Sequence, residues 1–289
     1  RREMSDQSQQ ELAYARMATL ADAKIRAPWA LQIVQAFMAG ATLSLGAMNA
    51  NLVEAMVEAN TSTTGLGNLI GGAVFPVGLI GIFLTGANLF TGNCMYVVPP
   101  LLNGTVSRTR ALGFLLVSFF ANFMGAALIT FLLGYKGEFF SADPARAFVI
   151  ANAEKKCSLG WGVAVLRGVG ANWLVCLGWW QALSCRTEDT ISKIFAIWWP
   201  TFTFTAIGFE HSIANMWYVD IGLMVGAETA FSDFVWRNLV PVVIGNFIGG
   251  GVFMGLAQWL AYDANGLKRW SPKVKEEDSG ALTLAVNSS

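Results

Sequence analysis

The chain has 289 residues, of which 54% are hydrophobic and only 13% are charged, and its formal net charge is zero. A soluble domain normally carries about 25% charged residues, so this composition excludes an ordinary soluble fold and indicates an all-α integral membrane protein. The zero net charge gives no reason to expect binding to nucleic acid or attachment to membranes through a polybasic surface.

Residues 1–27 are polar and mixed in charge, and their few apolar residues recur at roughly helical spacing. The segment has no apolar core of the kind found in a signal peptide. We expect it to form a cytoplasmic amphipathic helix that lies under the membrane.

Residues 28–265 carry the long apolar runs and should form the transmembrane domain. A membrane-crossing helix needs about 20 predominantly apolar residues. That length predicts six crossings, at about 29–53, 66–103, 110–134, 159–184, 194–225 and 235–262.

Two of these crossings, 66–103 and 194–225, are too long for one straight helix, and each contains an octet that opens with Gly and closes with Asn. The octets are Gly86–Asn93 and Gly208–Asn215. We expect each crossing to be two half-helices joined by an irregular break, which is tolerated at membrane depth only where it is buried in protein or lines a cavity.

The two halves of the domain, about 28–134 and 158–263, show a second match. Asn122-Phe123-Met124-Gly125 in the third crossing resembles Asn246-Phe247-Ile248-Gly249 in the sixth. Three crossings per half is an odd number, which predicts an inverted 3+3 repeat with its binding site at the membrane midplane. The alternative is a chance similarity between apolar segments that contain Gly and Asn.

The distribution of Lys and Arg predicts the orientation, because cytoplasmic loops are enriched in both. Most of them fall on the side that holds the two termini, so we expect both termini to be cytoplasmic. We also expect the protein to reside in the plasma membrane rather than in an organelle. Residues 266–289 are polar and should form a disordered cytoplasmic tail.

The longest external loop, 134–158, ends with Lys155 and Lys156. This loop is either simply solvated or a positive collar that concentrates anions at a pore mouth.

The candidate site lies where the two breaks should meet. His211 is the only histidine, and it stands beside Glu210 at membrane depth, where ionisable residues are costly and usually functional. Thr91 offers a hydroxyl from the other break, and the N-termini of broken helices favour anions. Apolar rings above and below would complete a pore, although ordinary aromatic packing is the alternative; the candidates are Phe75, Leu79, Phe90 and Phe204.

Enzymatic and metal-binding motifs are not found. The sequence has no HExxH, GxSxG or phosphate loop, and its four cysteines have no CxxC spacing. One histidine cannot supply the paired imidazoles of a bis-histidine haem, which argues against a membrane-embedded redox enzyme. We therefore predict a protein that is not an enzyme and needs no cofactor or metal.

The two octets, together with Ala171–Leu177 and Asn246–Gly250, resemble the formate/nitrite transporter family over about residues 28–265. The run Phe-Glu-His-Ser-Ile-Ala-Asn at 209–215 is highly specific. The resemblance implies an aquaporin-like protomer in a homopentamer with one pore per protomer. It also implies transport of small monovalent weak-acid anions such as formate, nitrite, hydrosulfide, acetate or lactate.

The resemblance also assigns roles to single residues. His211 corresponds to the family's central histidine, and Thr91 to its break threonine. The pore asparagine corresponds to Asn172, the outer vestibule lysine to Lys156, and the two constriction layers to the four apolar residues named above. The pore-supporting positions are Glu210, Asn88, Asn93 and Asn215. Asn88 departs from the family pattern, because many members carry Glu or Asp there.

The resulting hypothesis is a channel or transporter for small weak-acid anions, coupled to protons through His211. Its partners would be these anions, protons, the lipid bilayer and further copies of the chain. Two alternatives remain: an aquaporin-like channel for neutral small solutes, and an anion channel without proton coupling. Neither octet has the Asn-Pro-Ala motif of aquaporins, which argues against the first alternative.

Overall fold

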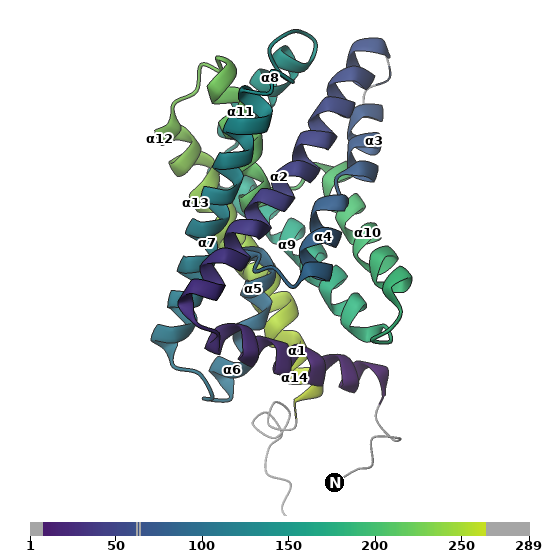
Figure 1. Cartoon of the computed structure of the whole chain (residues 1–289), viewed down its shortest axis with the longest axis vertical. Coiled ribbons are helices and arrows are strands. Elements are labelled where there is room, and N and C mark those ends of the chain that lie inside the picture. Colours follow the sequence, from purple (N-terminus) through teal and green to yellow (C-terminus); the bar gives the residue numbers. More distant parts are fainter. Residues whose placement is uncertain (1–7, 62, 64, 264–289) are drawn as a thin grey trace, which may run out of the picture.

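The computed structural model describes residues 8–61, 63 and 65–263, and within these ranges every regular element is helical. The helices are packed side by side in a bundle (Figure 1). In chain order they are α1 (Gln9–Arg26), α2 (Trp29–Asn60), α3 (Leu66–Val74), α4 (Val77–Thr85), α5 (Phe90–Tyr96), α6 (Val98–Leu102), α7 (Arg108–Ile129), α8 (Ala145–Cys157), α9 (Trp161–Ser184), α10 (Thr190–Ile207), α11 (Ser212–Val225), α12 (Phe231–Asp233), α13 (Val240–Phe247) and α14 (Ala257–Tyr262), with π-helical segments η2 (Thr130–Tyr135), η3 (Phe234–Leu239) and η4 (Ile248–Leu256).

Five helical stretches in the described part are long and apolar enough to cross a membrane: Trp29–Asn60, Leu66–Thr85, Arg108–Tyr135, Trp161–Ser184 and Phe231–Tyr262. Four of them coincide with predicted crossings, and Leu66–Thr85 is the first half of the predicted crossing 66–103, which is divided before α5 begins at Phe90. The remaining crossing, 194–225, is divided into α10 and α11 by an irregular stretch at 208–211, as the sequence predicts for a broken helix. The bundle therefore confirms an all-helical membrane fold, while the inverted repeat stays a prediction.

Helix α1 begins with a capping box, in which Ser8 and Glu11 exchange side-chain to backbone hydrogen bonds. One face of this helix is fully buried, through Ala13, Met17 and Ala21. The helix lies across one end of the bundle near α14, whereas α8 lies at the opposite end (Figure 1). The predicted amphipathic helix is therefore packed on protein. The predicted tail, 266–289, lies outside the described residues.

The predicted loop 134–158 contains a helix. Helix α8 covers Ala145–Cys157 and packs against α11 through buried Val149 and Ala153. Gly222 of α11 has no room for a Cβ, because such an atom would collide with Ala153 and the Val149 carbonyl. The prediction of a loop is thus wrong for this stretch, since α8 gains a buried face from its partner helix.

Helices α2 and α7 make the most extensive contact in the fold, and two glycines allow it. A Cβ on Gly40 would collide with the backbone of Asn122, and one on Gly125 would collide with the Phe37 carbonyl. Small residues permit such close approach of membrane helices.

We expect Gly125→Ala to destabilise the protein by about 1–3 kcal/mol, the usual cost of overpacking. Thermal unfolding in detergent measures this loss. Gly162→Ala is the control, since nothing lies within 4 Å of its added Cβ, and equal melting temperatures for the two variants would contradict the expectation.

Both broken crossings end their first half in the same way. Gly86 follows α4 with φ 73°, and Gly208 follows α10 with φ 79°, a left-handed conformation that glycine adopts without strain. The backbone then continues irregularly to Leu89 and His211, where α5 and α11 begin. The first break is shorter than predicted, because Thr91, Gly92 and Asn93 belong to α5 rather than to the irregular stretch.

Candidate pore at the two helix breaks

The two breaks meet at a direct side-chain contact. The Thr91 hydroxyl lies 2.9 Å from Nε2 of His211, and both residues are at most 1% exposed. Thr91 is in the first turn of α5, and His211 is the residue on which α11 begins. The structure thus joins the two residues that the sequence singled out, although they are far apart along the chain.

His211 is held in one tautomer by its position at the helix start. Its Nδ1 accepts a hydrogen bond of 3.1 Å from the backbone N–H of Ala214, so this nitrogen carries no proton. A neutral imidazole then bears its proton on Nε2, which can donate to Thr91. Protonating Nδ1 as well would remove the cap of α11. The local fold therefore favours a neutral histidine with one donor directed at Thr91.

Apolar side chains surround this contact. The Phe204 ring stacks on His211 with centroids 5.8 Å apart, and it meets Phe75 edge-on at 5.6 Å. Leu79 is fully buried, and Phe90 is 5% exposed and packs edge-on against Phe119. All four predicted constriction residues are therefore buried near the two breaks. Their action as pore constrictions stays a prediction.

Two asparagines fix the breaks in equivalent ways. The side chain of Asn122 accepts from Phe90 N at 2.8 Å and donates to the Asn88 carbonyl at 2.9 Å. Likewise Asn246 accepts from Ser212 N at 2.9 Å and donates to the Glu210 carbonyl at 3.1 Å. Because each break would otherwise leave buried backbone groups unpaired, these asparagines set its shape. The matching bonds support the predicted repeat.

Lys156 is part of a buried polar cluster at the second break. Its Nζ lies 3.0 Å from Oε1 of Glu210 and above the Tyr218 ring at 5.0 Å. The other carboxylate oxygen of Glu210 accepts from Asn215 at 2.7 Å and from Asn238 at 3.1 Å. The carboxylate is thus fully paired, which is what a buried charge requires.

The remaining predicted site residues lie behind the Thr91–His211 contact. Asn172 is fully buried and donates to the backbone carbonyls of Thr91 and Asn246. Asn93 donates to Ser118 Oγ at 2.8 Å. The structure therefore places Asn172 as a support of the first break. Its predicted contact with the transported anion stays untested.

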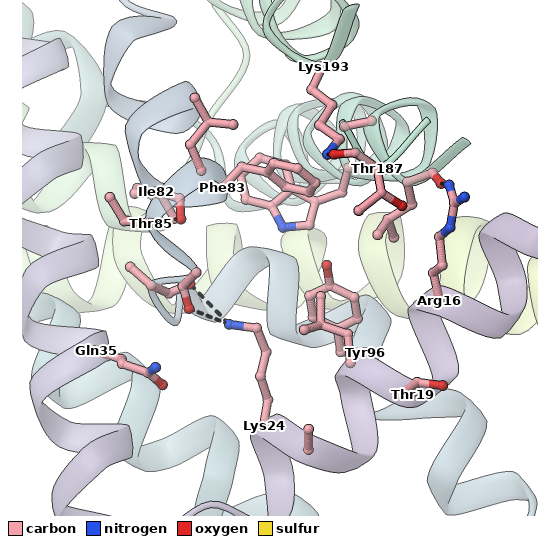
Figure 2. Close-up of a pocket in the computed structure, with 18 of the residues that line it drawn as sticks. Arg16, Thr19, Lys24, Gln35, Ile82, Phe83, Thr85, Tyr96, Thr187 and Lys193 are labelled. Carbon is pink, nitrogen blue, oxygen red and sulfur yellow. Dashed lines mark hydrogen bonds between the residues drawn. The ribbon is translucent and has the colours of Figure 1, made fainter. Parts of the chain in front are cut away.

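A cavity opens toward each end of the bundle. The cavity on the α8 side, here called the α8 vestibule, has about 300 Å³ and reaches His211 and Lys156. The cavity on the α1 side, the α1 vestibule, has about 930 Å³ and is lined by Lys24, Gln35 and Tyr96 among others (Figure 2). The buried Thr91–His211 contact and its apolar neighbours lie between the two.

Comparison with known proteins identifies this arrangement. The family model described as formate/nitrite transporter matches residues 10–260. The chain belongs to the formate/nitrite transporter family. It is 37% identical to a protein of Methanothermobacter thermautotrophicus named probable formate transporter, over 85% of this chain and 93% of that one.

Two solved structures are similar to the transporter. A structure titled "FNT family ion channel" superposes with a TM-score of 0.75 at 28% identity, covering 88% of this chain and 98% of the other. One titled "Pentameric formate channel with formate bound" gives a TM-score of 0.70 at 28% identity, covering 81% and 97%. The protein is therefore an integral membrane anion channel or transporter, and the prediction that it is not an enzyme is confirmed.

Sequence reasoning missed some residues of the transporter's site. Asn238 bonds Glu210 and Asn215, yet no motif marks it. Lys24 entered only the charge count, although its Nζ reaches the first break. Only the structure supplies the link: the carbonyls of Gln35 and Arg167 accept from Asn88 N and Glu210 N, and Lys24 precedes Gln35 by as many positions as Lys156 precedes Arg167. Within the described ranges, no group of three His, Cys, Asp or Glu residues could hold a metal ion.

Proposed function

We propose that the transporter moves small monovalent weak-acid anions, formate foremost, together with a proton. The observation that carries this proposal is the hydrogen bond between Thr91 and His211, which lies among buried aromatic side chains, with the α8 vestibule reaching His211 from one side. The similarity to a formate-bound channel supports the choice of formate. Nitrite, lactate, acetate and hydrosulfide have the same charge and weak-acid character and are the other candidates.

The first step is attraction of the anion into the α8 vestibule. Lys156 and Arg167 line this cavity, and Lys156 is tied to Glu210. The guanidinium of Arg167 has no carboxylate partner in the described part of the chain. The low-dielectric walls of a cavity focus the electric field of such a charge, which raises the local concentration of anions in the cavity.

The second step is protonation of the anion at the apolar constriction. Burial in a low-dielectric region disfavours the charged form of an acid, so the pKa of the entering anion rises. His211 stays neutral in this scheme, and its Nε2–H donates a hydrogen bond to the anion. The proton comes as hydronium from the aqueous phase of the α8 vestibule, so that one proton crosses with each anion. The neutral acid then passes Phe204, Phe75 and Leu79 and releases its proton on the other side.

We also propose a homopentamer with both termini in the cytoplasm of a plasma-membrane protein. The solved relative titled pentameric supports the assembly. Helix α7 exposes an apolar stripe at four-residue spacing, formed by Leu112, Leu116, Phe120 and Met124. Such a stripe on a membrane helix is suited to contact with lipid or with a neighbouring subunit.

The test is flux into proteoliposomes that contain a pH-sensitive dye, with formate, nitrite, lactate and chloride supplied in parallel. We expect proton entry with each transported weak acid and none with chloride. Rapid chloride flux without proton entry would instead indicate an anion channel without proton coupling. Liposomes without protein control for passive entry of the neutral acids.

A further inference from the structure

Two acidic residues on α2 face two glycines on α3. Glu54 and Glu58 are one helical turn apart on α2, and Gly71 and Gly67 are one turn apart on the adjacent helix α3. A Cβ on Gly71 would collide with the carboxyl group of Glu54, and a Cβ on Gly67 would press against the side chain of Glu58. The two glycines therefore leave room for both acidic side chains between the helices.

Glu54, the inner of the two acidic residues, is buried in a helix long and apolar enough to cross the membrane. It is 7% exposed and lies in the stretch Trp29–Asn60. Its one hydrogen bond with the described residues is long, 3.4 Å from Nδ2 of Asn51 to Oε2, and no ion pair in the described part of the chain includes it. Because a buried carboxylate without a counter-ion is costly, the neutral acid is the stable form. Glu54 thus holds a proton that it can transfer.

The carboxyl group of Glu54 is available to an entering anion, because Glu54 lines the α8 vestibule. Helix α3 contributes the uncharged Asn68 to this cavity. The other charged or titratable groups that line it are Glu58 on α2, Lys155 and Lys156 on α8, Arg167 on α9, and Glu210, His211 and Tyr218 on α11. The two lysines of α8 interact electrostatically with Glu54. An anion that these cations attract therefore enters the cavity that holds the carboxyl group.

We propose that Glu54 is the proton donor of the α8 vestibule, which passes protons from solvent to the entering weak-acid anion. This role rests on the proposed function, since it supplies the proton that crosses with the anion. A general acid that is fixed beside its substrate typically speeds proton transfer by about 10²–10⁴-fold.

The transfer balances one proton against one anion. The O–H bond of Glu54 breaks while a new O–H bond forms on the anion, which becomes the neutral acid. The carboxylate that remains on Glu54 is stabilised by the nearby positive charges of Lys155 and Lys156. Hydronium from the aqueous phase then protonates Glu54 again, so that each cycle takes one proton from solvent.

The test compares Glu54→Gln with wild type in sealed proteoliposomes, measuring the maximal rate of proton-coupled formate uptake from the α8 side. Glutamine has nearly the same shape as the neutral acid and can still accept from Asn51, so folding should persist. We expect the maximal rate to fall about tenfold or more. Glu58→Gln is the matched control on the exposed part of α2, and it should lower the rate by less than about twofold, since water can replace an exposed carboxyl group.

The pH dependence of the rate distinguishes a proton donor from a structural residue. As the external pH is lowered, hydronium protonates the anion directly in Glu54→Gln, so the deficit relative to wild type should shrink. A deficit of the same size at every pH would assign Glu54 a structural role and overturn the proposal. A lower formate KM with a higher rate in the variant would also overturn it, because Glu54 would then act only as a negative charge that repels anions.

The outcomes separate this proposal from the proposed function. Formate uptake without proton entry in wild type overturns the proposed function, and the donor role with it. Proton-coupled uptake in wild type, at an equal rate in Glu54→Gln, overturns the donor role alone.

Discussion

Replacing His211 by Asn should lower weak-acid flux by about 10- to 100-fold while leaving the fold intact. Asparagine is a good helix cap, so its side chain can still accept from Ala214 N and hold the start of α11. Its shorter side chain does not extend to Thr91, so the donor at the constriction is lost. A buried hydrogen bond to a charged group contributes about 1.5–3 kcal/mol, which corresponds to this range of rates.

The comparison with His211→Ala separates the two roles of the histidine. Alanine removes the cap as well, and a lost cap costs about 1 kcal/mol. We expect both variants to have equally low flux in proteoliposomes, but only the alanine variant to melt at a lower temperature. Flux like that of wild type in His211→Asn would show that the contact with Thr91 is structural and would remove the main support for the proposed mechanism.

Local sequence signals predicted the breaks well, because their causes are local. Gly86 and Gly208 adopt left-handed backbone that other residues rarely adopt, and each ends a helix where the sequence indicated. The start of α5 at Phe90 was harder to predict from the sequence. It depends on Asn122, which accepts from Phe90 N across the bundle, and no window of sequence around the octet contains that partner.

The missed helix α8 and the hydrogen-bond partners of Asn172 could not be predicted for the same reason. The segment 145–157 has little hydrophobic pattern of its own, and its buried face exists because α11 offers Gly222 for close approach. Asn172 lies in the predicted crossing 159–184, and its side-chain amide donates to the backbone carbonyls of Thr91 and Asn246. Composition predicts that such a polar group needs partners, but only the fold decides which ones.

The charge chemistry of the two vestibules was also only partly predictable. The sequence identified Lys156 and Glu210 separately, and the fold brings them to 3.0 Å. It marked Asn88 as a departure from the family without showing what that residue faces. Only the structure shows that Asn88 accepts a hydrogen bond from Lys24, which lies on a helix outside the predicted transmembrane domain.

The second large effect concerns the buried pair of Lys156 and Glu210. We expect Glu210→Gln to lower the free energy of unfolding by about 2–4 kcal/mol, because Lys156 is only 12% exposed and would lose its counter-ion. The single amide oxygen of glutamine also cannot replace both carboxylate oxygens, of which one accepts from Lys156 and the other from Asn215 and Asn238. For a chain of this size the melting temperature should fall by about 5–10 °C, measured by thermal unfolding of the purified protein in detergent.

Two further variants test the reason for this loss. Lys156→Met should cost less than Glu210→Gln, since the carboxylate keeps the amide donors of Asn215 and Asn238. The double variant should be more stable than Glu210→Gln alone, because it leaves no unpaired buried charge. If instead the losses of the two single variants simply add in the double variant, the two charges do not stabilise each other. The carboxylate would then act only through its bonds to the two asparagines, and Lys156 would be available to the anion as a free cation.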